Sequence, residues 1–152
     1  MAQADFMRGI SSYIFVYGTL LPTTRWHEHF AKYFGARIGR AFVPGKIYHL
    51  LDGWPILVPN DSGSVWGEVF SLQDVSALIY LDAYEGCEMD ADKDSMICRD
   101  IIKATLEDGA TYDVWHYFAP PALADFATET GLYLADGDWL AWAEDNLVDW
   151  KA

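Results

Sequence analysis

The stretch RIGRAFVPGKIYHLLDGWPILVPNDSGSVWGEVFS, residues 37–71, contains four short runs rich in β-branched and aromatic residues. Glycine, proline and asparagine turns separate these runs, which is the pattern of short strands joined by tight connections. The predicted strands are Arg37–Val43, Lys46–Leu51, Trp54–Val58 and Val65–Ser71, divided at Pro44-Gly45, Asp52-Gly53 and Asn60-Asp61-Ser62-Gly63. No helix interrupts this series, so the stretch predicts a fold built on an antiparallel or mixed sheet.

Further strands are predicted on both sides of this stretch. Tyr13–Tyr17 is a compact apolar run that stops at Gly18, as expected for a buried strand followed by a tight loop. Arg99–Leu106 and Tyr112–Phe118 form a predicted hairpin across the Glu107-Asp108-Gly109 turn. Strands in this order do not fit a repeated strand-helix-strand winding. We therefore expect an α+β fold with a small mixed, barrel-like sheet and flanking helices.

Three helices are predicted from apolar spacing and end signals. The first covers Trp26–Phe34 and ends at Gly35. The second begins at Ser71 as N-cap, with Asp74 three residues later, and ends at Glu85-Gly86. Its predicted buried face consists of Leu72, Val75, Leu78 and Ile79. Pro120-Pro121 then breaks the sheet, and Asp138 caps a last amphipathic helix with Trp139, Trp142, Leu147 and Trp150 on one face.

Length and composition indicate one globular domain. The 152 residues are 52% hydrophobic and 16% aromatic, which excludes a disordered chain and predicts a well-filled core. We expect a single domain over residues 1–152, with a core at about 13–142 and an acidic helical tail. A formal net charge of -13 disfavours nucleic acid and anionic membrane surfaces as partners. Without an apolar span or a secretory start at Met1–Ser12, the expected location is cytoplasmic.

Glu85 stands at the predicted end of the second helix, directly before Gly86. A helix ends with unsatisfied carbonyl groups and a partial negative charge, so an ionised carboxylate there is disfavoured and its pKa rises. Such a group suits general acid/base work near neutral pH. Position alone does not establish this role, because most glutamates at helix ends are simply solvated.

The turn Gly18-Thr19-Leu20-Leu21 is a second candidate, because it follows a buried strand. Glycine there allows backbone N–H groups to point outward and hold a carboxylate or an oxyanion. An ordinary strand-to-loop turn, with Tyr17 in the core, explains the same residues. The paired glycines and lysine of a phosphate-binding loop are missing.

Metal sites are not favoured. His27-Glu28-His29 has the wrong spacing for two ligands on one helical face. The run Asp90-Ala91-Asp92-Lys93-Asp94 imitates the start of a calcium loop, but Ser95 replaces the turn glycine and Ile101 replaces the bidentate glutamate. We expect solvated segments at both places.

The two cysteines, Cys87 and Cys98, are expected to be free thiols, since two thiols do not make a disulfide framework. Cys87 lies beside Glu85 and must be considered as a nucleophile, with His27, His29, His49 or His116 as base. No local signature supports this reading, and a buried cysteine is the simpler interpretation.

Several motifs together resemble the gamma-glutamyl cyclotransferase-like family. They are Phe15-Val16-Tyr17-Gly18-Thr19-Leu20, Gly45-Lys46-Ile47-Tyr48, Trp54-Pro55, Val65-Trp66-Gly67-Glu68-Val69-Phe70, Leu81-Asp82-Ala83-Tyr84-Glu85-Gly86, Arg99, Trp115-His116-Tyr117 and Gly137-Asp138-Trp139. Their order and spacing agree with the family over roughly residues 13–142. The Tyr-Gly-Thr-Leu and Glu-Gly pair is the most specific part.

The resemblance implies a small α+β barrel in which the loop after the first strand and Glu85 meet in one cavity. It implies that Glu85 is the general acid/base that closes a gamma-glutamyl amine or dipeptide into 5-oxoproline and releases an amine. Tyr17, Gly18, Thr19, Leu20 and Tyr117 would bind the substrate, for Tyr117 with a purely structural role as a comparable alternative. The reaction would need no metal and no cofactor, and the protein would be a monomer or a small homo-oligomer.

The sequence departs from the family pattern at two places. Ile97-Cys98 stands where relatives often carry a Tyr-Arg step, and Leu21-Pro22-Thr23-Thr24-Arg25 lacks the usual glycine and basic residues. These departures leave the substrate open. A protein that binds a small metabolite in the same cavity without turning it over is the alternative from another class.

Overall fold

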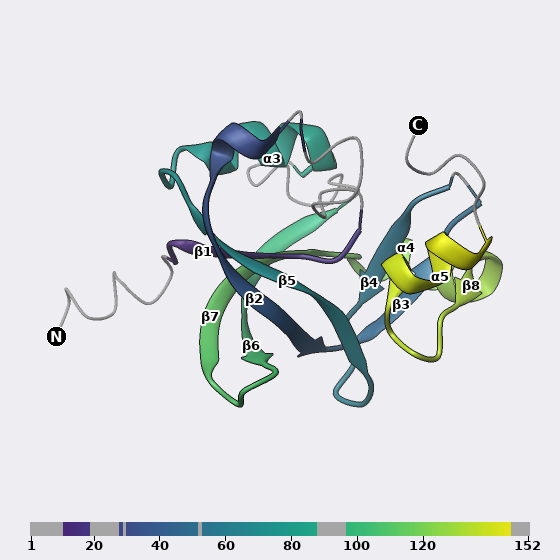
Figure 1. Cartoon of the computed structure of the whole chain (residues 1–152). Helices are drawn as coiled ribbons and strands as arrows, with labels where there is room; N and C mark the ends of the chain where they lie inside the picture. Colours follow the sequence, from purple (N-terminus) through teal and green to yellow (C-terminus); the bar gives the residue numbers. More distant parts are fainter. Residues whose placement is uncertain (1–10, 19–27, 29, 52, 88–96, 147–152) are drawn as a thin grey trace, which may run out of the picture.

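A computed structural model describes residues 11–18, 28, 30–51, 53–87 and 97–146 of the chain (Figure 1). Five strands close into a barrel in the order β1-β5-β2-β6-β7. They are β1 (Tyr13–Val16), β2 (Phe34–Pro44), β5 (Ser64–Leu72), β6 (Cys98–Leu106) and β7 (Thr111–Phe118). All neighbours pair antiparallel except β1 and β7, which run parallel. The predicted α+β fold with a small mixed barrel is therefore confirmed.

A three-stranded antiparallel sheet in the order β4-β3-β8 lies beside the barrel. It consists of β3 (Lys46–His49), β4 (Pro55–Val58) and β8 (Leu132–Tyr133). Figure 1 shows α4 (Pro121–Thr130) and α5 (Trp139–Asn146) on this side of the molecule, while α3 (Ala77–Glu85) lies over the barrel near β1. The Ala119 N–H donates to the Leu57 carbonyl at 2.9 Å and joins the end of β7 to β4.

Strand β1 is buried on both of its faces, which explains its continuous apolar sequence. Ile14 and Val16 belong to the core cluster beneath α3, with Leu78 and Leu81. Phe15 alternates with them and belongs to the second cluster, together with Val65, Val69 and Val114 of the other barrel strands. A short strand with two buried sides carries its end, and Tyr17 after it, into the interior of the molecule.

The second predicted helix starts later than expected. Ser71 and Leu72 continue β5, and α3 begins only at Ala77. The Ser71 hydroxyl accepts the Ala36 N–H at 2.7 Å instead of capping a helix, so strand pairing outweighs the local capping signal. The predicted buried face is also partly wrong: Val75 and Ile79 are exposed, whereas the helix buries Ala77, Leu78 and Leu81.

Other helix predictions have mixed outcomes. Ala31–Tyr33 forms a single 3₁₀ turn, and Phe34 and Gly35 already belong to β2, so the predicted end of the first helix is wrong. Positions 26, 27 and 29 of that prediction lie outside the described residues. Helix α4 was not predicted, although Pro121 occupies its first position, where proline is well accepted. The Asp138 cap is confirmed, since its carboxylate accepts the Ala141 N–H at 3.1 Å.

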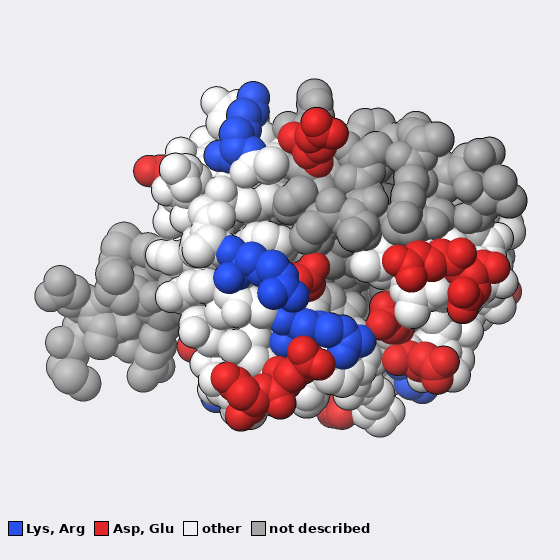
Figure 2. Space-filling model, in the orientation of Figure 1, with Lys and Arg blue, Asp and Glu red and all other residues white. Residues whose placement is uncertain are grey.

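Arginines on the outer barrel wall lie against carboxylates (Figure 2). Arg37 pairs with Glu68, and Arg40 pairs with Asp138 at 2.9 Å while stacking over the Trp66 ring at 4.2 Å. The positive charge of these two arginines is therefore neutralised locally. No described helix has the length and apolar character that crossing a bilayer requires.

Candidate active site

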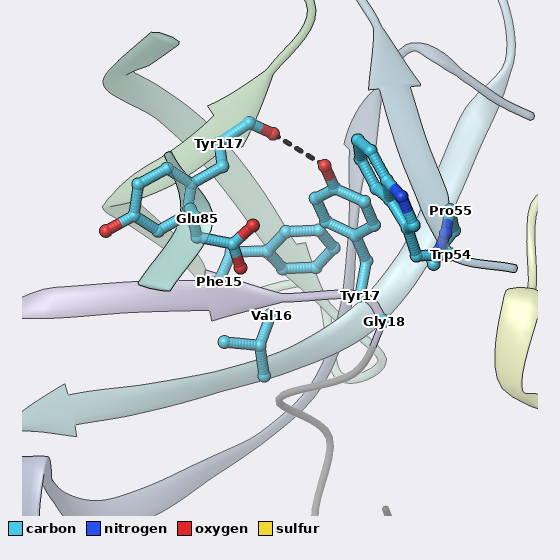
Figure 3. A pocket seen from close by; sticks show the side chains of 8 residues that line it. All are labelled: Phe15, Val16, Tyr17, Gly18, Trp54, Pro55, Glu85 and Tyr117. Atoms are coloured by element: carbon cyan, nitrogen blue, oxygen red, sulfur yellow. Dashed lines mark hydrogen bonds between the residues drawn. The ribbon is translucent and has the colours of Figure 1, made fainter. Parts of the chain in front are cut away.

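A pocket opens where β1 and β7 separate. These parallel strands are paired only at Ile14 and Trp115, and beyond that point their ends diverge. Residues from four segments line the pocket there (Figure 3). They are Phe15, Val16, Tyr17, Gly18, Trp54, Pro55, Glu85 and Tyr117. Its space is about 370 Å³ when open solvent is included, and about 30 Å³ of it has room for groups the size of a water molecule. The pocket thus lies at the parallel seam of the barrel, at the end of β1.

Tyr17 bridges the gap between the diverging strands. Its hydroxyl donates to the Tyr117 carbonyl at 2.8 Å, drawn as a dashed line in Figure 3, and accepts the Leu57 N–H at 3.2 Å. The side chain thereby connects β1, β7 and β4. Burial raises the Tyr17 pKa, as does the nearby Glu85 charge, although the Leu57 N–H acts in the opposite direction. Its hydroxyl is committed to the backbone, so the ring is what Tyr17 presents to the pocket.

Gly18 packs against the wall formed by the loop before β4. A Cβ atom at Gly18 would lie 2.6 Å from Cγ of Pro55, so only glycine fits at this distance. The loop is held by two hydrogen bonds of 2.9 Å, from Gly53 N–H to the Leu50 carbonyl and from Leu50 N–H to the Trp54 carbonyl. Close packing, which sequence reasoning did not anticipate, is therefore one physical reason for the glycine here.

Glu85 reaches the pocket because α3 ends there. Gly86 adopts the left-handed conformation, with φ 79°, and the Cys87 N–H donates back to the Asp82 carbonyl at 2.8 Å. The predicted helix end at Glu85-Gly86 is thus confirmed. Although Glu85 is only half-buried as a residue, its carboxyl group points into the pocket toward the Phe15 ring (Figure 3).

The pKa of Glu85 is raised to about 7. Burial of the carboxyl group is the main cause, and the negative charge of Asp82 adds to it. No hydrogen bond from a described residue counters these effects. The direction agrees with the sequence-based expectation, but the leading cause is burial in the pocket rather than the helix end.

A network of polar side chains lies beside Glu85. Arg99 donates to both oxygens of Asp82, from Nε at 2.7 Å and from Nη2 at 2.9 Å, and the Tyr117 hydroxyl donates to the Asp82 Oδ1 at 2.8 Å. Arg99 stacks over the Trp115 ring at 4.3 Å. Although burial acts against it, the Asp82 carboxylate raises the Arg99 pKa. Burial first, and Asp82 second, raise the Tyr117 pKa.

Four of the six predicted site residues therefore meet in one pocket, namely Tyr17, Gly18, Glu85 and Tyr117. Thr19 and Leu20 lie outside the described residues. Sequence reasoning gave no role to Trp54 or Pro55, although that step was among the family motifs. Asp82 and Arg99 were likewise quoted without a role, and only the fold brings them to Tyr117 and Glu85.

The other sequence candidates lie elsewhere. Cys87 is buried in the core cluster under α3 and does not line the pocket. Neither Cys87 nor Cys98 forms a disulfide, as expected. In the part of the chain that the structure describes, no three His, Cys, Asp or Glu side chains are grouped to hold a metal ion. His27, His29 and the run from Asp90 to Asp94 fall outside it.

Comparison with known proteins gives the same fold. YkqA from Bacillus subtilis has a TM-score of 0.65 and 22% identity, covering 90% of this chain and 42% of YkqA. The uropathogenic E. coli-specific protein c4763 has a TM-score of 0.62 and 19% identity, covering 88% and 95%. A gamma-glutamyl cyclotransferase has a TM-score of 0.53 and 18% identity, covering 81% and 68%. The chain thus spans less than half of YkqA but nearly all of c4763.

No curated protein matches the sequence closely enough to count as a relative. The pattern of the family described as gamma-glutamyl cyclotransferase, AIG2-like, in contrast, matches residues 14–141, which is most of the chain. Family membership supports an enzyme of the cyclotransferase type in general. The chain belongs to the gamma-glutamyl cyclotransferase, AIG2-like family.

Proposed function

We propose that this protein converts a gamma-glutamyl amine or dipeptide into 5-oxoproline and a free amine, with Glu85 as general acid/base. The α-amino nitrogen of the substrate attacks its own γ-carbonyl carbon, and a new C–N bond closes the five-membered lactam. The C–N bond of the γ-amide then breaks, and the departing nitrogen takes up one proton. One proton is removed and one is returned, so the reaction needs neither an oxidant nor a second substrate.

The position and proton affinity of Glu85 support this proposal most directly. Its carboxyl group points into the pocket at the end of β1, and its pKa of about 7 leaves both protonation states populated near neutral pH. A group of this kind accepts a proton from the attacking amine and returns it to the leaving amine. The nucleophile and the electrophile already belong to one molecule, so the pocket mainly has to fold the substrate into the geometry of attack.

The surroundings of Glu85 suit a small polar substrate with an extended chain. We propose that backbone N–H groups at Gly18, Thr19 and Leu20 hold the substrate carboxylate or the developing oxyanion. The Tyr17 ring and Tyr117 form one wall, and Trp54 and Pro55 form another. Proton transfer and oxyanion stabilisation are both within reach of these groups, so the mechanism requires neither a metal ion nor a cofactor.

The direct experiment replaces Glu85 by glutamine, which keeps the shape but removes the titratable proton. A panel of gamma-glutamyl amines and dipeptides is incubated with each protein, and 5-oxoproline is quantified by mass spectrometry. We expect Glu85→Gln to lower turnover by about 10²–10⁴-fold. Glu129→Gln, which makes the same chemical change on the exposed surface of α4, serves as the matched control and should keep full activity.

Retained 5-oxoproline release by Glu85→Gln would overturn the assignment of Glu85. A metabolite-binding protein without turnover predicts a different result: no substrate yields product, and ligand-induced thermal stabilisation survives in Glu85→Gln. Inactivation by Cys87→Ser together with a fully active Glu85→Gln would instead favour a thiol mechanism.

A further inference from the structure

The Asp82 carboxylate is the most heavily hydrogen-bonded acidic group beside the pocket, yet it does not line the pocket itself. It accepts hydrogen bonds from Arg99 on β6 and from Tyr117 on β7. The side chains of Arg99 and Asp82 are only 10% and 14% exposed. Three hydrogen bonds from two strands hold the Asp82 carboxylate at a fixed place.

That place is one helical turn before Glu85. Residues three apart on a helix lie on the same face, so the carboxylates of Asp82 and Glu85 both face the barrel from α3. Asp82 also provides the carbonyl that accepts the Cys87 N–H at 2.8 Å after the helix has turned at Gly86. Asp82 thus contacts the barrel with its side chain and closes the helix end with its backbone.

We propose that Asp82 is a positioning residue for Glu85: clamped by Arg99 and Tyr117, it fixes the end of α3 against the barrel and places its carboxylate beside the Glu85 carboxyl group. This inference rests on the function proposed above, because it matters only if Glu85 transfers protons. Arg99 acts through Asp82, because it donates to both of its carboxylate oxygens.

The titratable groups coupled to Glu85 come from three packed parts of the chain. Asp82 on α3 acts on Glu85, and the Glu85 charge in turn acts on Tyr17, directly after β1, and on Tyr117 of β7. Both tyrosines are neutral at physiological pH because burial raises their pKa values. Asp82 is therefore the described group whose charge changes the proton affinity of Glu85.

The experiment follows the Glu85 titration by carboxyl ¹³C NMR in the full-length protein without substrate, with Glu85→Gln identifying the signal. We expect Asp82→Asn, which removes the charge but keeps the shape, to lower the Glu85 midpoint by about one pH unit. Arg99→Gln should move the midpoint in the opposite direction, because Asp82 then loses its neutralising partner. Asp125→Asn on the exposed surface of α4 removes the same charge far from the pocket and should leave the midpoint in place.

Two results would overturn the inference: an Asp82→Asn midpoint equal to that of the Asp125→Asn control, or shifts of the same sign in Asp82→Asn and Arg99→Gln. If Asp82→Asn does not fold, the upward shift in Arg99→Gln decides alone. The pH profile of 5-oxoproline formation is measured in parallel. Asp82→Asn can shift the NMR midpoint of Glu85 and leave the pH profile of 5-oxoproline formation unchanged. That result would support the inference about Asp82 and contradict the proposed role of Glu85 in turnover.

Discussion

Two carboxylates on α3, one turn apart, have opposite surroundings. Asp82 is engaged by a guanidinium group and a phenol hydroxyl, whereas the Glu85 carboxyl group points into an aromatic-lined pocket with no hydrogen bond from a described residue. The first arrangement holds the Asp82 carboxylate in place, and the second disfavours the charged form of Glu85. The same helix therefore carries one carboxylate that holds the fold together and one whose burial weakens the fold and leaves it available for proton transfer.

The largest expected effect on stability comes from removing the cation that pairs with Asp82. Arg99→Met leaves a largely buried carboxylate, 14% exposed, without its cation and should lower the free energy of unfolding by about 3–5 kcal/mol. Urea denaturation monitored by tryptophan fluorescence measures the change. Arg37→Met is the control: its partner Glu68 is 14% exposed, like Asp82, but the Arg37 side chain itself is 55% exposed, so water already screens the pair and the loss should be smaller. Equal losses in the two variants would contradict a special role for the Asp82 clamp.

Replacing Glu85, in contrast, should raise the free energy of unfolding. Because the pKa of Glu85 rises from 4.5 to about 7 on folding, the folded state binds its proton more tightly than the unfolded state. Its contribution to stability is full below pH 4.5 and is lost as the pH rises through about 7. Glu85→Gln stays neutral, so it should match the wild type near pH 4 and exceed it by up to about 3 kcal/mol at pH 8.

The measurement for Glu85→Gln is the difference in unfolding free energy between variant and wild type across this pH range. Subtracting the two curves of unfolding free energy against pH removes the contributions of the other titrating groups. A difference that does not grow with pH would show that Glu85 is not destabilised by burial.

A smaller effect is expected where Tyr17 bridges the opening strands. Tyr17→Phe removes the partner of the Leu57 N–H and the Tyr117 carbonyl, so stability should fall by about 1–3 kcal/mol while the ring still fills its place. Tyr80→Phe is the control, since Tyr80 is 55% exposed and should show almost no change. Thermal unfolding of both variants measures the difference, and a Tyr17→Phe protein as stable as the control would mean that water replaces the bridge.

The smallest effect is predicted on the outer face of α3, away from both carboxylates. Ile79 is 68% exposed, so Ile79→Ser should change stability by no more than about 0.5 kcal/mol. The helical spacing that placed Ile79 in the buried face predicts a loss several times larger. Chemical denaturation separates the two outcomes directly.

Much of the fold could be predicted because its signals are local. Turn residues and β-branched runs mark the barrel strands, and Gly86 marks the end of α3 as a left-handed cap. Where local and tertiary signals compete, the prediction fails. Ser71 is a good helix cap in isolation, but its segment pairs with β1 and β2 instead, so the helix begins six residues later at Ala77.

The candidate site shows the same division. Glu85 and Gly18 could be selected from sequence because a helix end and a strand-ending glycine are short patterns. The partners of Asp82 could not be selected this way, because Arg99 and Tyr117 lie 17 and 35 residues away in sequence. Pairing at that separation depends on the barrel register, which no short motif encodes.

The pairing of β1 with β7 has a consequence for how the protein is made. The Tyr17 hydroxyl and the Tyr117 carbonyl are separated by 100 residues, and Ile14 faces Trp115 across the same seam. At roughly 5–20 residues per second of synthesis, β1 leaves the ribosome on the order of 5–20 s before its partner exists. Because β1 pairs with a strand that is distant in sequence, closure of the barrel is expected to be slow. We expect the pocket to form only after β7 has been synthesised.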